Sequence, residues 1–282
     1  MNGKTILEGD MLKGLKLGFI GGGNMGGVLV GGLISGELAN ATDIIVSDVA
    51  EEKRNHLHKT WGVHTTANNP EAVRNRDIVV LAVKPQNMDA VLEEISGDVH
   101  LSTLIISIAA GIPTHRIERS FPQAMRVIRT MPNTPALITE GMSALARGSH
   151  AKIDDLQIAR ELFDAVGLTV EVDESLMDAV TGVSGSGPAY GFLFVEAIME
   201  AAVQLGLDKQ TALKLAAQTL LGAAKLCLKE EKTPAELRAM VTSPGGTTLE
   251  ALKVLEKLKF KDTVIEAVKA ATRRSRELAG GK

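Results

Sequence analysis

Cysteine is nearly absent from the sequence, which is 282 residues long and contains Cys227 alone. A single cysteine cannot form a disulfide within the chain, so the fold cannot depend on such crosslinks. The residues around Cys227 are apolar with helical spacing, which predicts a buried and inert thiol. This cysteine usage is typical of a reducing compartment, and we expect a cytoplasmic protein.

Charge of one sign is not in excess. The chain has 31 basic and 34 acidic residues, giving a net charge of -3, and the two signs are interspersed. Without a basic field, nucleic acid and acidic membrane surfaces are excluded as partners. A secretory signal is not expected either, because the opening residues MNGKTILEGD carry acids and glycine where a basic stretch would precede an apolar one.

Long apolar runs free of charge are also missing. The most apolar stretch, Ala189 to Leu207, contains Glu196 and Glu200, which would lie on one side of a helix. It therefore predicts a buried helix of a globular protein and not a membrane span. The six histidines are scattered, and His56 and His58 would diverge on a helix, so we predict no metal site.

Short β-rich runs alternate with helical stretches through residue 172. Strands are predicted at residues 15–20, 43–47, 77–83, 103–109, 125–130, 141–146 and 168–172, with a helix at 153–166. Apolar runs of this length between helices are typical of a parallel sheet covered on both faces. We therefore predict a doubly wound, Rossmann-type α/β domain over residues 15–172, preceded by a disordered extension over residues 1–14.

After residue 172 the chain becomes rich in Ala, Leu, Glu and Lys. Helices are predicted at residues 188–206, 209–229, 233–241, 247–258 and 261–279, with Pro188, Pro234 and Pro244 near their starts. Residues 173–282 are therefore predicted to form an all-helical domain. Five such helices leave more apolar surface than they can hide among themselves, which predicts an intertwined homodimer.

A glycine-rich turn follows the first predicted strand directly. Gly21-Gly22-Gly23-Asn24-Met25-Gly26 satisfies the pattern G-x-G-x-x-G and opens a helix that runs to about Ile34. Such a turn presents backbone N–H groups and a helix N-terminus to a pyrophosphate, and a Cβ at the first two glycines would block the turn or the phosphate. The alternative is a plain βα turn, but the position between a strand and a helix favours dinucleotide binding.

Asp48 ends the second predicted strand, where an acid would bind the adenine ribose hydroxyls and repel a 2′-phosphate. This favours NADH. Lys53 and Arg54 follow closely and could swing toward a phosphate, and Asp48 could instead cap the next helix. NADH and NADPH both stay open as the cofactor.

Two later segments, Ala82-Val83-Lys84-Pro85 and Ala109-Ala110-Gly111, close predicted strands at the carboxyl edge of the sheet. Ligands bind at this edge, so we expect both segments to line the nicotinamide half of the cleft. A lysine before a loop proline is more often a solvated turn residue than a base, and Lys84 is assigned cofactor contact only.

Two glycine-rich segments interrupt the helical half of the chain, at residues 183–188 and 241–248. Glycine in or before helices lowers stability, so a function for these segments is expected. In the second, Pro244 fixes a turn, and the following N–H groups and hydroxyls converge near a helix start, which suits an anionic carboxylate. The alternative is an ordinary turn in which Ser243 or Thr247 only caps the next helix.

Over residues 15–279 the chain resembles the pyrroline-5-carboxylate reductase family, which makes proline in the last step of its biosynthesis. The resemblance lies in GFIGGGNMG at 18–26, AVKP at 82–85, AAG at 109–111, VIRTMPNTP at 127–135, DAVTGVSGSGPAY at 178–190 and VTSPGGTT at 241–248. The last two segments are far more specific than the dinucleotide pattern. The resemblance implies an NAD(P)H-dependent oxidoreductase that forms a homodimer, which could assemble further into an oligomer such as a decamer.

The resemblance also implies the substrate site. In such enzymes the SPGGTT segment binds the imine or proline across a dimer interface, which places Ser243, Gly245, Gly246 and Thr247 on the carboxylate and Thr248 at the ring nitrogen. Glu231 matches a position near the ring, although the neighbouring Glu230 leaves the alignment open by one residue.

The cofactor site follows from the dinucleotide pattern together with the resemblance, which adds Asn69 as a ribose contact. Relatives often carry Ser, Thr or Asn where this chain has Asp48, a departure that bears on the preference for NADPH. The predicted cofactor-binding residues are Ile20, Gly21, Gly22, Gly23, Asn24, Met25, Asp48, Asn69, Ala82, Val83, Lys84, Pro85, Ala109, Ala110 and Gly111.

Two alternatives belong to other classes. A 3-hydroxyacid dehydrogenase would share a Rossmann domain and a helical tail, but it needs a general acid or base, and GSGPAYGF at 185–192 lacks the lysine expected there. A non-enzymatic dinucleotide-binding protein would keep the glycine-rich turn without needing SPGGTT, and tight NAD(P)H binding without imine turnover would support it.

Overall fold

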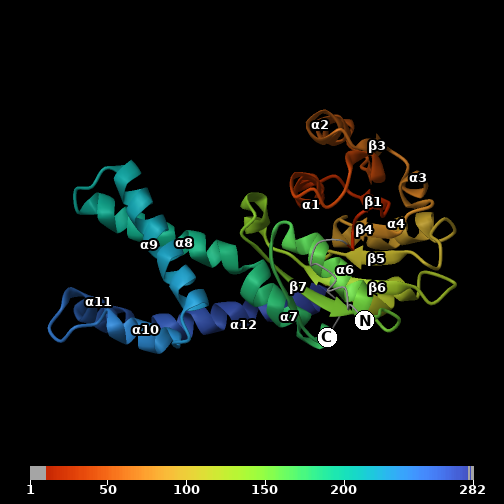
Figure 1. Ribbon diagram of the computed structural model, residues 1–282. Coiled ribbons are helices and arrows are strands. Elements are labelled where there is room, and N and C mark those ends of the chain that lie inside the picture. The colour runs from red at the N-terminus through yellow and green to blue at the C-terminus, as the bar shows by residue number, and fades with distance from the viewer. Residues whose placement is uncertain (1–10, 279, 281–282) are drawn as a thin grey trace, which may run out of the picture. The chain divides into compact units, whose positions relative to one another are not determined.

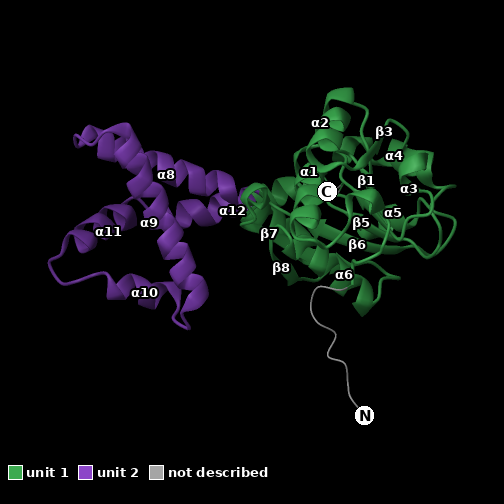
Figure 2. Ribbon diagram, turned by 45° about the horizontal axis from the view of Figure 1, so that its top comes forward, with its two compact units in different colours: residues 1–185, 271–282 green, residues 186–270 purple. Residues whose placement is uncertain are grey.

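The computed structural model describes residues 11–278 and residue 280. Contacts divide the chain into two compact units (Figure 2): unit 1 comprises residues 1–185 and 271–282, and unit 2 comprises residues 186–270. The domain boundary predicted at residue 172 stays a prediction, and the contact division falls at Gly185. Residues 271–278 also belong to unit 1, which no sequence pattern indicated.

Unit 1 is built on an eight-stranded sheet with the order β3-β2-β1-β4-β5-β6-β7-β8 (Figure 1). The strands are β1 (Leu17–Ile20), β2 (Ile44–Ser47), β3 (His64–Thr66), β4 (Ile78–Leu81), β5 (Leu104–Ser107), β6 (Arg126–Met131), β7 (Gly141–Arg147) and β8 (Gly167–Glu171). Seven strands match predicted runs. The sequence missed β3, because a three-residue strand of polar, partly exposed residues carries no apolar pattern.

The prediction of a parallel sheet is wrong for one pair of strands. β1 to β6 pair in parallel, but β7 runs antiparallel to β6, with Met131 opposite Ala144, and β8 runs parallel to β7. The connection between β6 and β7 contains only the short helix η3 (Thr134–Ile138). A parallel return needs a crossover of a dozen or more residues, so this connection allows only an antiparallel neighbour.

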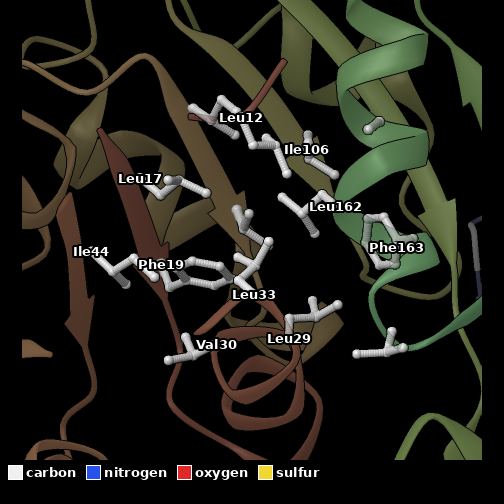
Figure 3. Packing of buried hydrophobic residues seen from close by; sticks show 14 of the residues in the cluster. Leu12, Leu17, Phe19, Leu29, Val30, Leu33, Ile44, Ile106, Leu162 and Phe163 are labelled. Atoms are coloured by element: carbon white, nitrogen blue, oxygen red, sulfur yellow. The ribbon is translucent and has the colours of Figure 1, made fainter. Parts of the chain in front are cut away.

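Two apolar clusters cover the faces of the sheet, as expected for a doubly wound fold. One is formed by β-strand residues with α1 (Asn24–Ser35) and α6 (Ile153–Asp164), and Figure 3 shows Phe19, Leu29 and Phe163 within it. The other is formed with α4 (Met88–Ile95) and α5 (Thr114–Glu118). Further short helices of unit 1 are η1 (Ala41–Asp43), α2 (Glu51–Trp61), α3 (Asn69–Val73), η2 (Pro85–Asn87), η4 (Glu174–Leu176), α7 (Met177–Val180) and the π-helix η5 (Thr181–Gly185).

The core begins before the first strand. Leu12 is fully buried in the first apolar cluster (Figure 3), and the backbone N–H of Met11 donates a hydrogen bond to Glu161 at 3.0 Å. Residues 1–10 of the predicted disordered extension (1–14) lie outside the described residues. Leu12, which falls within the same predicted extension, belongs to the folded core. Lys13 and Gly14 separate Leu12 from the first predicted strand, so Leu12 did not extend that apolar run.

Unit 2 is helical and contains α8 (Gly187–Gln204), α9 (Lys209–Lys229), α10 (Pro234–Met240) and α11 (Thr247–Lys257), with the first part of α12 (Phe260–Leu278). α8 and α9 pack against each other, and the rings of Phe194 and Phe260 lie 5.7 Å apart. The final turns of α12 belong to unit 1, where Ser275 donates a hydrogen bond to Asp178 at 2.7 Å.

Burial in unit 2 is low. α8 contains no buried residue, and Phe192 and Leu193 are 68% and 65% exposed, so the expectation of a buried helix is wrong for the single chain. Cys227 is exposed, which corrects the prediction of a buried thiol. Both errors have one cause, because apolar sequence was taken to mean burial within the same chain. No helix among the described residues is long and apolar enough to cross a membrane.

Candidate functional site

In the turn between β1 and α1, backbone atoms leave no room for a side chain at two of the glycines. Gly21 has a φ of 104°, a conformation that favours glycine, and its N–H donates to the Ser47 carbonyl oxygen at 2.7 Å. A Cβ on Gly21 would lie 2.5 Å from the Ala82 carbonyl oxygen, and a Cβ on Gly26 would lie 2.2 Å from the Gly21 carbonyl oxygen. Glycine is therefore required at both positions by the turn itself.

Gly23 differs from its neighbours, since a Cβ added there would meet nothing within 4 Å. Gly23 precedes α1 with a φ of -72°, and no side chain caps the helix. The first N–H groups of this 12-residue helix are therefore free to bind an anion. The open space beside Gly23 and these amides fits the pyrophosphate of a dinucleotide.

Asp48 lies directly after β2 and supports the same turn. Its Oδ2 accepts a hydrogen bond from the N–H of Gly22 at 2.9 Å, and its Oδ1 accepts one from the N–H of Ala50 at 2.8 Å. The side chain is 7% exposed. Ala50, and not Asp48, is the residue that precedes α2 as its N-cap. Asp48 thus fixes the glycine-rich turn to the end of β2.

Two cations next to Asp48 are engaged within the same loop. Lys53 Nζ lies 3.5 Å from Asp48 Oδ2, and Arg54 Nη1 donates to the carbonyl oxygens of Asp48 and Val49 at 2.7 and 3.2 Å. Lys53 is half exposed, so its ion pair is weak and screened by solvent. In this arrangement both cations contact oxygens of their own loop.

Asn69 begins α3 and reaches the end of β2. Its Oδ1 accepts a hydrogen bond from Ser47 Oγ at 2.7 Å, and its Nδ2 donates to Glu94 Oε2 at 2.7 Å. Nearby, a hydrogen bond from Thr66 lowers the pKa of the Glu71 carboxyl, with His64 as a second cause. The end of the site where the ribose is expected is therefore rich in carboxylates.

The remaining predicted cofactor residues follow β4 and β5. The N–H of Ala82 donates to the Ile20 carbonyl oxygen at 2.8 Å, which places residues 82–85 beside the glycine-rich turn. The N–H of Ile108 donates to Leu81 at 3.1 Å, which places Ala109, Ala110 and Gly111 next along the edge. Lys84 is exposed at the start of η2. The sheet order reverses between β1 and β4, and ligands bind outside such a switch point.

A cavity of about 630 Å³ opens beside this turn. Gly22, Gly23 and Asn24 line one end, and the cavity continues between α1, α2 and residues 136–139. None of residues 82–85 or 109–111 lines it. The cavity therefore touches the pyrophosphate end of the predicted site and does not reach the nicotinamide end.

In unit 2 the segment 241–248 forms a tight turn before α11. Gly245 has a φ of 71°, and the N–H of Gly246 donates to the Ser243 carbonyl oxygen at 3.0 Å. A Cβ on Gly246 would lie 2.4 Å from Ser243 Oγ and 3.1 Å from the Ser243 carbonyl oxygen, so the turn is tight at this position. Gly246 is the N-cap residue, and no side chain caps α11. The alternative in which Ser243 or Thr247 caps the helix is therefore not what the structure contains.

Glu231 is exposed in the loop between α9 and α10. The seven residues of α10 (Pro234–Met240) separate it from the turn at 243–248. A helix of this length spans about 10 Å, so α10 places the two at opposite ends. Within one chain, α10 therefore separates Glu231 from Thr248.

Sequence reasoning missed two connections in unit 1. Asn133 Nδ2 donates to Ser184 O and Ser184 Oγ, both at 3.2 Å, across 51 residues of chain. Glu174 accepts hydrogen bonds from the N–H and Oγ1 of Thr114, both at 2.6 Å, and lies 3.5 Å from the buried Arg129. The resemblance marked the segments that contain Asn133 and Ser184, but no spacing rule indicated that they meet.

Taken together, the switch-point turn and the uncapped helix beside it define a dinucleotide-binding oxidoreductase of Rossmann type with an added helical unit. Residues 16–111 match the family model described as NADP oxidoreductase, coenzyme F420-dependent. Residues 174–278 match the model described as pyrroline-5-carboxylate reductase dimerisation.

Similar proteins agree over nearly the whole chain. A pyrroline-5-carboxylate reductase from Synechocystis is 46% identical over 264 residues, which is 94% of this chain and 98% of the relative. The structure of a pyrroline-5-carboxylate reductase from Coxiella burnetii has 42% identity and a TM-score of 0.87, covering 95% of this chain and 99% of that one. That of the Plasmodium falciparum pyrroline carboxylate reductase with NADP bound has 32% identity and a TM-score of 0.85, covering 94% and 98%. The chain belongs to the pyrroline-5-carboxylate reductase family.

Proposed function

We propose that this protein reduces 1-pyrroline-5-carboxylate to L-proline with NADH or NADPH, the last step of proline biosynthesis. The observation that carries the proposal is the glycine-rich turn at the switch point between β1 and β4, in a chain of this family. The backbone alone requires Gly21 and Gly26, while the space beside Gly23 is open. This combination is suited to a pyrophosphate at the N-terminus of α1.

In this proposal unit 1 binds the cofactor. The N–H groups that begin α1 bind the pyrophosphate, Asp48 and Asn69 bind the adenine ribose, and residues 82–85 and 109–111 line the nicotinamide half. The reduced nicotinamide, when bound, supplies the hydride. The protein holds the reacting carbon of the imine close to the nicotinamide and excludes water from the site.

The turn at 243–248 binds the substrate. Ser243, Gly245, Gly246 and Thr247 surround the substrate carboxylate, because the uncapped N-terminus of α11 favours negative charge. Thr248 orients the ring nitrogen through its hydroxyl. The carbon that accepts the hydride is most electrophilic when the imine nitrogen is protonated, so no strong protein acid is required. Glu231 favours the cationic nitrogen if a neighbouring subunit brings it to the ring.

We also propose that the protein is a cytoplasmic homodimer, which could assemble further into a decamer. Support comes from unit 2, where large apolar side chains such as Phe192, Leu193 and Leu205 are mostly exposed in the single chain. Large apolar side chains exposed in such number are typical of a protein interface. The match of residues 174–278 to a dimerisation model points the same way.

Steady-state kinetics tests the proposed function. The purified protein should oxidise NADH or NADPH only when 1-pyrroline-5-carboxylate is present, and proline should accumulate in equal amount. Binding of NAD(P)H without turnover of the imine would contradict the proposal and support a non-enzymatic dinucleotide-binding protein.

A further inference from the structure

The carboxamide of Asn133 connects two segments that lie far apart in the sequence. Its Nδ2 donates to Ser184 O and Ser184 Oγ at 3.2 Å each, while its Oδ1 accepts the N–H of Met142 at 2.8 Å. One amide therefore forms hydrogen bonds with three polar atoms, the carbonyl oxygen and Oγ of Ser184 and the backbone N–H of Met142 in β7. An amide with two donors and an acceptor is the smallest side chain that can do so.

Asn133 follows β6 at the same sheet edge as the predicted cofactor residues. β5 and β6 are parallel neighbours, with Ser107 opposite Arg129. Ala109 and Met131 each come two residues later, so they extend side by side beyond the last aligned pair. The end of β6 therefore lies next to Ala109, at the sheet edge where the nicotinamide is expected.

The segment that Asn133 holds is the π-helix Thr181–Gly185. A π-helix is rare and occurs most often at functional sites. Gly185 lies against the end of β6, because a Cβ there would be 2.5 Å from Met131 Cε. Thr181 Oγ1 donates to the Met177 carbonyl oxygen at 2.9 Å, which fixes the start of the segment, and Asn133 fixes its end.

We propose that Asn133 is a positioning residue, which sets the reaction geometry by holding Ser184 and the 181–185 turn against the end of β6. The turn then forms the fixed wall beside the nicotinamide half of the cleft. The inference rests on the proposed function, since it assigns Asn133 to the hydride-transfer step. Asn133 itself touches neither substrate nor cofactor in this assignment.

Asn133→Asp tests this with a nearly isosteric change. The carboxylate keeps an acceptor for the Met142 N–H but loses both donors and repels the Ser184 carbonyl oxygen. We expect kcat for imine reduction to fall about tenfold while the Kd for NADH, measured by fluorescence, stays within about twofold. The isotope effect on kcat with NADH deuterated at the transferred position should rise. In the protein without cofactor, amides of residues 181–185 should exchange about tenfold faster.

Ser184→Ala and Asn40→Asp complete the experiment. Ser184→Ala keeps the carbonyl contact and should lower kcat about threefold, which serves as the test if Asn133→Asp does not fold. Asn40→Asp makes the same chemical change at an exposed loop and should leave kcat and exchange at 181–185 unchanged. Unchanged kcat, or unchanged exchange at 181–185, in folded Asn133→Asp overturns the proposal. A wild-type protein that does not reduce the imine would instead refute the proposed function.

Discussion

The carboxylate of Asp48 and the backbone N–H of Gly22 are joined by a hydrogen bond of 2.9 Å. The acid at the end of β2 therefore has two effects on the cofactor site. Its hydrogen bond fixes the glycine-rich turn, and its charge lies where the adenine ribose is expected. A substitution at Asp48 removes both effects, and only matched variants can separate them.

Asp48→Ser should shift the cofactor preference toward NADPH. Removing the carboxylate relieves its repulsion of a 2′-phosphate and frees Lys53, which now lies 3.5 Å from Asp48 Oδ2. We expect the ratio of kcat/KM for NADPH to that for NADH to rise at least about tenfold, which corresponds to about 1.4 kcal/mol. Steady-state kinetics with both cofactors measures the ratio.

The control for this prediction is Asp48→Asn, which removes the charge and keeps an oxygen for the Gly22 N–H, while its amide nitrogen cannot accept the N–H of Ala50. The same shift in preference with a smaller loss of affinity is expected, because the hydrogen bond to the glycine-rich turn is kept. If the ratio of kcat/KM for NADPH to that for NADH is unchanged in both variants, Asp48 does not contact the ribose.

Gly23→Val should abolish cofactor binding without unfolding the protein. The backbone at Gly23 has a negative φ and nothing lies within 4 Å of an added Cβ, so the valine displaces the pyrophosphate and no protein atom. NADH titration by fluorescence and thermal unfolding measure the two effects. A folded variant that binds NADH normally would contradict the assignment.

Gly21→Ala is the matched contrast at the same turn. Its Cβ would lie 2.5 Å from the Ala82 carbonyl oxygen, at a φ of 104°. This variant should lose stability by about 1–3 kcal/mol and cofactor affinity together. The pair thus separates glycines needed by the turn from the glycine needed by the ligand.

The sequence predicted unit 1 well wherever apolar runs carried a period. β1, β2 and β4 to β8 all fall on predicted runs, and the signal is clearest for β1, β2, β4 and β5, whose buried parallel strands read as continuous apolar segments. The direction of β7 was missed because strand patterns contain no information on orientation, which the short η3 connection decides. The exposure of α8 and Cys227 in the single chain was missed because apolar composition does not say which chain covers the surface.

The candidate site was predictable only where its residues share a local motif. Residues 21–26 and 243–248 are contiguous, so the turn chemistry of glycine and proline reveals them. Asn133 and Ser184 are 51 residues apart, and Ser275 meets Asp178 across 97. Such contacts depend on the packing of separate elements, on which periodicity carries no information.

Phe192→Asp should dissociate the proposed homodimer. Phe192 is 68% exposed in the single chain, so a charge there should be harmless to a monomer but would be desolvated in a dimer interface. Light scattering should give at least twice the chain mass of 29.9 kDa for the wild type and the mass of a monomer for the variant. Leu101→Asp is the control, because Leu101 is 53% exposed in unit 1. A wild-type protein of monomeric mass would contradict the dimer.

Thr248→Ala should lower turnover of the imine about ten- to a hundredfold, or about 1.4 to 2.7 kcal/mol, while cofactor affinity stays near wild type. The reason is that Thr248 lies in unit 2 beside the uncapped start of α11, whereas the cofactor residues lie in unit 1. If Thr248 only stabilised the helix start, its loss would cost about 1 kcal/mol of unfolding free energy and leave kcat per folded enzyme unchanged. Thermal unfolding measured beside kinetics separates the two roles. Thr263→Ala is the control and should affect stability alone. It removes a hydroxyl in α12 that donates a hydrogen bond to the carbonyl oxygen of Lys259. A Thr248→Ala protein that melts earlier yet reduces the imine at the normal rate would exclude the substrate role.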